Sequence, residues 1–174
     1  MAETRAAPAT SVMAEAEERK KVVVVVGVDD SDHSYHALEW AVRHVAAAAA
    51  EGAELVVVHG KPSASSVVSF GSPAAAGDVV RFVEADLRKR AEDVVDRARS
   101  LCVANSVHCL IEVIEGEARY VLCNAVEKHR ADLLIVGSHG YGAIKRAFLG
   151  SVSDYCAHHA RCSVVIVKQP KPKI

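Results

Sequence analysis

The feature that most constrains the fold is a series of short β-branched runs. The first spans Val22–Val28 and is valine at six of its seven positions. A continuous apolar run of this length is typical of a strand buried on both faces of a parallel sheet. Four further runs have the same character and predict four further strands, at Leu55–His59, Val107–Ile114, Leu133–Val136 and Val164–Val167.

Amphipathic segments separate these strands. After the turn residues Asp29–Asp32, apolar residues recur every three or four positions from Tyr35 to Val45, which predicts a helix, and Gly52 is suited to end it. Three more helices are predicted, at Asp78–Ala104, Glu117–Arg130 and Ser151–Ala160. This alternation predicts an α/β fold in which right-handed crossovers place helices on both faces of a doubly wound parallel sheet.

Two segments lack this pattern. Residues 1–20 show no apolar periodicity and are rich in Ala, Glu and basic residues, so we expect a disordered tail before one domain at residues 21–170. The stretch Lys61–Gly77 consists mostly of Ser, Ala, Gly and Pro. Because connections of this length are uncommon in compact domains, we expect an exposed loop or flap there.

Charge and composition narrow the class of protein. The 21 basic and 22 acidic side chains give a net charge of −1, which argues against a nucleic-acid-binding surface. No apolar stretch approaches the roughly 20 residues of a membrane span, and the N-terminus has no apolar signal-peptide region. Five cysteines, an odd number, fit free thiols in a reducing compartment. The sequence therefore predicts a cytoplasmic protein, with the nucleus as a second compartment.

The most informative segment joins the fourth predicted strand to the last predicted helix. It reads Gly137-Ser-His-Gly140 and, nine residues later, Gly150-Ser151-Val-Ser153. Glycines after a strand let the backbone approach a ligand, and the N–H groups of the first helical turn favour an anion. Lys145 or Arg146 can add positive charge. The segment therefore predicts a phosphate-binding site.

Better-known motifs are excluded at this segment. A Walker A loop needs Lys and Ser or Thr after Gly142, where Ala143 and Ile144 stand, and a dinucleotide fingerprint starting at Gly140 needs Gly where Lys145 stands. The segment also lacks the nucleophile elbow of serine hydrolases. Near the last helix, Cys156 and His159 have helical spacing, but the paired ligands of zinc sites are missing, so no metal site is assigned.

These residues carry a resemblance to a known family. The spacing G-x-x-G-x9-G-[ST] after Leu-Leu-Ile-Val-Gly-Ser, with the opening strand ending Val-Asp-Asp-Ser, resembles the ATP-binding branch of the universal stress protein family. The run that starts at Gly140 is similar to the plant single-domain members. The resemblance covers Lys21 to Lys168 and implies a Rossmann-like sheet, of the adenine nucleotide alpha hydrolase type, with strand order 3-2-1-4-5.

The resemblance also implies site residues and partners. It implies an adenine nucleotide, ATP or AMP, with Val28 and Asp29 at the adenine or ribose end. Position 60 contacts adenine through its backbone; many members have Val there, whereas this chain has Gly60. Homodimerisation is implied through antiparallel pairing of the last strand, residues 163–168. Further implied contacts are with ribose, at Val136 and Gly137, and with phosphates, at Gly140, Gly150, Ser151, Val152 and Ser153.

Three functions remain open on the sequence. The leading hypothesis is a stress-response regulator or sensor whose nucleotide state alters a dimer or a partner surface. The second is a slow ATPase or autophosphorylating enzyme, in which Asp29, Asp30 and Asp32 hold Mg²⁺ and His139 acts as a base. The third is a redox or chaperone-like interaction protein that uses its thiols and the 61–77 flap. Since each of these residues also suits a turn, cap or loop role, no catalytic residue is assigned.

Overall fold

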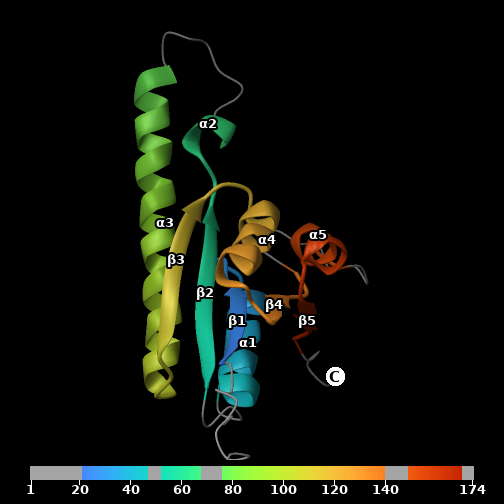
Figure 1. Ribbon diagram of the computed structural model, residues 1–174. Coiled ribbons are helices and arrows are strands. Elements are labelled where there is room, and N and C mark those ends of the chain that lie inside the picture. Colours follow the sequence, from blue (N-terminus) through green and yellow to red (C-terminus); the bar gives the residue numbers. More distant parts are fainter. Residues whose placement is uncertain (1–20, 47–51, 68–75, 140–148, 170–174) are drawn as a thin grey trace, which may run out of the picture.

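The sheet has five parallel strands. The computed structural model describes residues 21–46, 52–67, 76–139 and 149–169. Within them the strand order is β3-β2-β1-β4-β5, and every pairing is parallel. The predicted fold and strand order are therefore confirmed (Figure 1). The strands are β1 (Val22–Gly27), β2 (Ala53–Lys61), β3 (Cys109–Glu115), β4 (Leu133–Gly137) and β5 (Ser163–Val167).

Helices connect the strands close to the predicted positions. They are α1 (Asp32–Ala41), its continuation η1 (Val42–Ala46), α2 (Ala64–Val67), α3 (Ala76–Ala104), α4 (Ala118–His129) and α5 (Ser151–His159). Two features differ from the prediction. The end of the first helix widens into the π-helical turn η1, and the expected 61–77 loop contains the short helix α2 and the first residues of α3.

The start of β3 also differs from the predicted strand, which began at Val107. Ser106 has a positive φ of 56°, and the N–H of Val107 bonds the carbonyl oxygen of Cys102 at 2.9 Å. This hydrogen bond satisfies a carbonyl at the C-terminal end of α3. Val107 therefore belongs to the helix-terminating turn, and pairing with β2 begins at Cys109.

Each face of the sheet buries its own apolar cluster. Side chains alternate along β1, so that Val24 and Val26 face one layer of helices while Val25 faces the other. The first cluster packs beneath α1 and α3, and the second beneath α4 and α5. Val24 to Val26, in the middle of the valine run, are thus fully buried on both faces, which is the arrangement that the composition of the run predicts.

The helix α3 is much longer than the strands it covers. It runs beside β3 and continues beyond the carboxyl ends of the strands, next to α2 (Figure 1). Ala91, Val94 and Ala98 are buried against the sheet, whereas none of residues 77–90 is buried. None of the described helices is both long and apolar enough to cross a membrane. The predicted tail, residues 1–20, lies outside the described residues.

Candidate functional site

The turn after β1 is held by a compact set of hydrogen bonds. An Asp29 carboxylate oxygen accepts the N–H of Ser31 at 3.0 Å and also the Ser31 hydroxyl. Ser31 in turn caps α1, its hydroxyl oxygen accepting the N–H of Ser34 at 3.2 Å. The Ser34 hydroxyl oxygen accepts the Asp29 N–H at 3.1 Å. Asp29 is therefore fixed at the carboxyl end of β1 by the turn that starts α1.

The end of β2 is joined to the end of β1 by a buried imidazole. His59 is 9% exposed, and its Nδ1 lies 2.9 Å from the carbonyl oxygen of Val28. Because a carbonyl only accepts, Nδ1 carries the proton in this contact. The next residue, Gly60, lies against α4, where an added Cβ would come within 2.8 Å of the Ala118 Cα. Val28, His59 and Gly60 thus form one packed unit beside Asp29.

The end of β4 lies against the start of α1. A Cβ added at Gly137 would stand 2.8 Å from both the carbonyl carbon and the carbonyl oxygen of His33. Val136, one residue earlier, faces the other side of the sheet and is 4% exposed. The absence of a side chain at Gly137 therefore lets the first turn of α1 approach the strand, which brings Asp29 and Gly137 to the same edge of the sheet.

The start of α5 is tied to this edge through Ser138. The carbonyl oxygen of Ser138 accepts the N–H of Gly150 at 2.8 Å and the Ser153 hydroxyl at 3.3 Å. The Ser153 hydroxyl also donates to the carbonyl oxygen of Gly150 at 2.9 Å, and Ser153 is 2% exposed. The Ser153 hydroxyl thus fixes the backbone between the end of β4 and the start of α5.

The first turn of α5 has backbone donors without a partner among the described residues. Within those residues, Asp154 is the first residue of the helix whose N–H bonds a preceding carbonyl, that of Gly150 at 2.9 Å. Gly150 is the N-cap, and among the described residues no side chain caps the helix. The N–H groups of Ser151, Val152 and Ser153 therefore present the positive end of the helix dipole. Such a terminus suits an anionic ligand.

Two histidines stand where β4 meets α1. The rings of His33 and His139 have centroids 5.3 Å apart, and Nδ1 of His139 lies 3.0 Å from the Ser138 hydroxyl. Nδ1 of His33 is buried and has no hydrogen-bond partner among the described residues. The sequence analysis gave His139 a hypothetical role as a base but gave none to Ser138, which lies in the same segment, or to His33. A polar residue directly after a buried strand was the available signal for Ser138.

Several predicted residues lie outside the described ranges. They are Gly140, Gly142, Lys145 and Arg146. The other predicted site residues lie within the described ranges, at or just after the ends of β1, β2 and β4 or at the start of α5. They are Val28, Asp29, Gly60, Val136, Gly137 and Gly150 to Ser153. These termini meet at one edge of the sheet because its strands are parallel. Within the described part of the chain, no group of three or more His, Cys, Asp or Glu side chains is placed to hold a metal ion.

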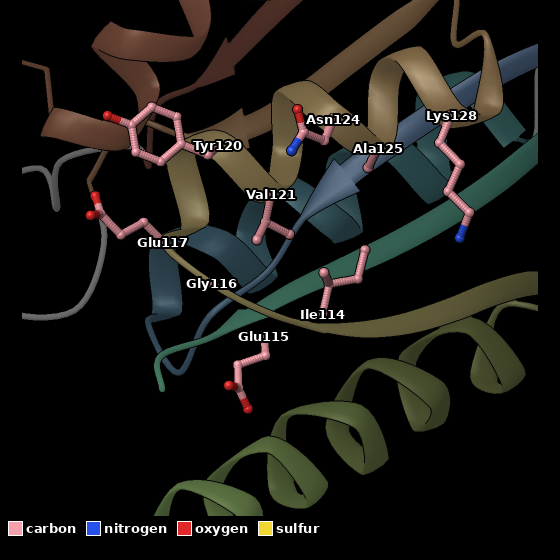
Figure 2. A pocket seen from close by; sticks show the side chains of 9 residues that line it. All are labelled: Ile114, Glu115, Gly116, Glu117, Tyr120, Val121, Asn124, Ala125 and Lys128. Atoms are coloured by element: carbon pink, nitrogen blue, oxygen red, sulfur yellow. The ribbon is translucent and has the colours of Figure 1, made fainter. Parts of the chain in front are cut away.

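A separate cavity of about 540 Å³ lies between the end of β3 and α4. Figure 2 shows Ile114 pointing from β3 toward α4, where Val121 and Lys128 point back toward the sheet, while Glu115 points to the opposite side. Glu117 and Tyr120 stand at the start of α4. The cavity contains none of the residues predicted to bind nucleotide.

The five free cysteines form two groups. Cys102 and Cys109 interact at the end of α3, and Cys156 lies with Cys123 and Cys162 between α4, α5 and β5. Burial raises the pKa of Cys102 to about 12 and that of Cys156 to about 12. Buried thiols with raised pKa values are poor nucleophiles, so these two residues behave as core side chains.

Comparisons with known proteins agree with this architecture. A model of the universal stress protein family matches residues 12–168. Universal stress protein PHOS34 of Arabidopsis thaliana is 34% identical over 168 residues, and the match covers 83% of this chain and 61% of that protein. The chain thus spans less than two thirds of the length of this relative.

Two solved structures share the fold. A universal stress protein family protein from Arabidopsis thaliana with AMP bound is 22% identical, with a TM-score of 0.61, over 86% of this chain and 92% of that one. A universal stress protein in complex with cAMP is 25% identical, with a TM-score of 0.60, over 84% of this chain and 96% of that one. Together with the family match and the strand order, these findings show that the chain belongs to the universal stress protein family.

Proposed function

We propose that this chain binds an adenine nucleotide, AMP or ATP, at the carboxyl edge of its sheet and acts as a nucleotide-dependent stress-response regulator. The observation that carries the proposal is the uncapped start of α5, where the N–H groups of Ser151, Val152 and Ser153 have no partner among the described residues. Its position beside the end of β4, fixed through Ser138, is the position expected for a phosphate site in a parallel α/β sheet.

The remaining site residues suit the other parts of a nucleotide. Asp29 brings a carboxylate to the edge, and a carboxylate at the end of a strand suits the hydroxyls of a ribose. We assign the backbone at Val28 and Gly60 to the base in this proposal, and Val136 and Gly137 to the ribose. Gly140 completes the phosphate contacts in this proposal. The related structures with AMP bound and in complex with cAMP support an adenine nucleotide as the ligand.

The proposed regulatory role is supported by Ser138, whose backbone bonds both the start of α5 and the strand β5. The hydrogen bond from the Ser138 N–H to the carbonyl oxygen of Val167, at 3.0 Å, joins the phosphate end of the site to β5. β5 is an edge strand with half-buried apolar residues, and we propose that residues 163–168 pair with the same strand of a second copy. Nucleotide binding at α5 would then act directly on the dimer edge.

Native mass spectrometry and thermal unfolding of the full chain test the ligand. We expect an adenine nucleotide to copurify or, on addition of AMP or ATP, to raise the midpoint of unfolding, because a ligand at 100 times its dissociation constant stabilises a fold by about 2.7 kcal/mol. GMP at the same concentration is the control. If adenine nucleotides give neither a bound mass nor a shift larger than that of GMP, the proposal fails.

A further inference from the structure

The first three turns of α3 carry two different faces. On one side, Val80, Val83 and Leu87 are half-buried and continue the line of the buried residues Ala91 and Val94, which lie against the sheet. This part of the helix extends beyond the sheet, next to α2 (Figure 1), and its opposite face is exposed. The outward face is therefore the part of α3 available to another molecule.

An aromatic side chain stands in the middle of this outward face. Phe82 is 78% exposed, more than any other large apolar side chain among the described residues. Asp78, Ala85 and Lys89 are exposed on the same face, since positions 78, 82, 85 and 89 follow each other at intervals of four, three and four residues. This face therefore has a direction along the helix. It has an acidic residue at one end, a basic residue at the other and a Phe–Ala pair between them.

We propose that two copies of this chain associate through antiparallel packing of this outward face, residues 78–89 of α3. If a two-fold axis passes between residues 83 and 84, Asp78 comes level with Lys89 of the second copy, and Phe82 with Ala85 of the second copy. Each contact occurs twice, as a two-fold interface requires. The small side chain of Ala85 leaves room for the ring of Phe82, an arrangement that resembles a knob in a hole.

The charges select this orientation and disfavour the alternative. Parallel packing in register would place Asp78 against Asp78 and Lys89 against Lys89, which is repulsive. Asp86, at the flank of the face, is neutralised within its own helix by Arg90, whose Nε lies 2.8 Å from its carboxylate. The antiparallel pair is therefore self-complementary, which identifies a second copy of the chain as the occupant.

This surface is distinct from the one proposed at β5. The helix α3 contacts β2 and β3, and β3 and β5 form opposite edges of the sheet. A segment of twelve residues is about 18 Å long, so the contact is small and its association concentration-dependent. Two-fold surfaces at opposite edges would allow dimers formed at one edge to associate further through the other.

Charge reversal with mixing tests the proposal on the full chain. Asp78→Lys alone and Lys89→Asp alone should each raise the dissociation constant of this contact about tenfold or more, because two attractive pairs become repulsive. An equal mixture of the two variants should restore it, since each then meets an opposite charge at both positions. Sedimentation velocity over a range of concentrations measures all three samples, and circular dichroism checks that α3 stays helical.

A second pair of variants tests the aromatic anchor. Phe82→Lys should weaken association about thirtyfold, as is typical of a buried aromatic anchor in an interface. Val103→Lys is the matched control: it is 70% exposed, lies on the same helix outside residues 78–89, and should leave association unchanged. The proposal is overturned if the wild-type chain does not self-associate or if these variants do not weaken its self-association. It is also overturned if the mixture of the two charge variants associates no better than either variant alone. Self-association that is insensitive to every substitution would belong to β5 and would equally overturn it.

Discussion

Gly137 lies so close to His33 that a Cβ on the glycine would be 2.8 Å from two backbone atoms of the histidine. This contact joins the end of β4 to the first turn of α1, and through α1 to the turn that fixes Asp29. The glycine that the sequence assigned to a ligand contact therefore also has a packing role. Gly137 does not have a positive φ. A glycine is therefore needed at this position because His33 approaches closely, and not because the backbone adopts an unusual conformation.

Substitution of this glycine should strain the fold. In Gly137→Ala the new methyl group meets backbone rather than a flexible side chain, so α1 must shift, and we expect a loss of about 1–3 kcal/mol in the free energy of unfolding. Gly77→Ala is the control, since a Cβ there has nothing within 4 Å and the site is helical. Denaturant unfolding compares the two; equal stability of both variants would contradict the packing role.

Asp29 offers a way to separate structure from ligand binding. Asp29→Asn keeps an oxygen that accepts the N–H and hydroxyl of Ser31, so the turn should persist, but loss of the charge should weaken nucleotide binding about tenfold. Asp29→Ala should also lower the stability by about 1 kcal/mol, because the turn before α1 loses its acceptor. Calorimetric titration with AMP and thermal unfolding measure the two effects. Wild-type affinity in both variants would remove Asp29 from the proposed site.

The buried imidazole of His59 should be a structural requirement. In His59→Leu the carbonyl oxygen of Val28 loses the donor that lies 2.9 Å away in a buried environment, and we expect a loss of about 1–3 kcal/mol. In His158→Leu, whose side chain is 72% exposed, the change should stay within about 0.5 kcal/mol. Urea unfolding of both variants checks this. A His59 variant as stable as the His158 variant would show that the hydrogen bond contributes little.

Stability should fall in alkaline solution. Burial raises the pKa of Cys102 and of Cys156 from 9.0 to about 12, and that of Tyr35 from 10.0 to about 12. The unfolded chain therefore loses these protons first, so stability is fully present below pH 9 and declines as the pH rises toward 12.

A variant that lacks both thiols isolates their share of this decline. Cys102→Ala/Cys156→Ala should be less stable at neutral pH, because it leaves cavities in both core clusters, yet its stability should fall less steeply above pH 9. Ser100→Ala, at an exposed position of α3, should keep the wild-type slope. Unfolding free energies between pH 7 and pH 10.5 provide the comparison. Identical slopes for the double variant and the wild type would contradict the raised pKa values.

Most of the sheet could be predicted because burial on two faces leaves a direct mark on composition. The valine run of β1 and the apolar runs of β2 and β4 are of this kind. The start of β3 could not be placed, because Val107 is apolar yet belongs to the turn that ends α3. The helix α2 was missed for a related reason: a segment of Ala, Ser and Val has no period that separates a short helix from a loop.

The candidate site was predictable in position but not in the role of every atom. Where strands end and α5 begins follows from the chain pattern, and this placed Asp29, Gly137 and Gly150 correctly at the edge. Other roles depend on neighbours that are distant in sequence. Gly60 packs against Ala118, and the Ser153 hydroxyl bonds the carbonyl oxygen of Ser138 as well as that of Gly150. Tertiary packing of this kind leaves no local pattern to read.

Isothermal titration of AMP and of ATP into the full chain measures adenine-nucleotide binding itself. We predict saturable binding of one adenine nucleotide per chain, with AMP and ATP competing for the same site because both place a phosphate at the start of α5. If neither nucleotide binds, while circular dichroism and cooperative unfolding show that the fold is intact, the claim that this chain is a nucleotide-binding protein is wrong.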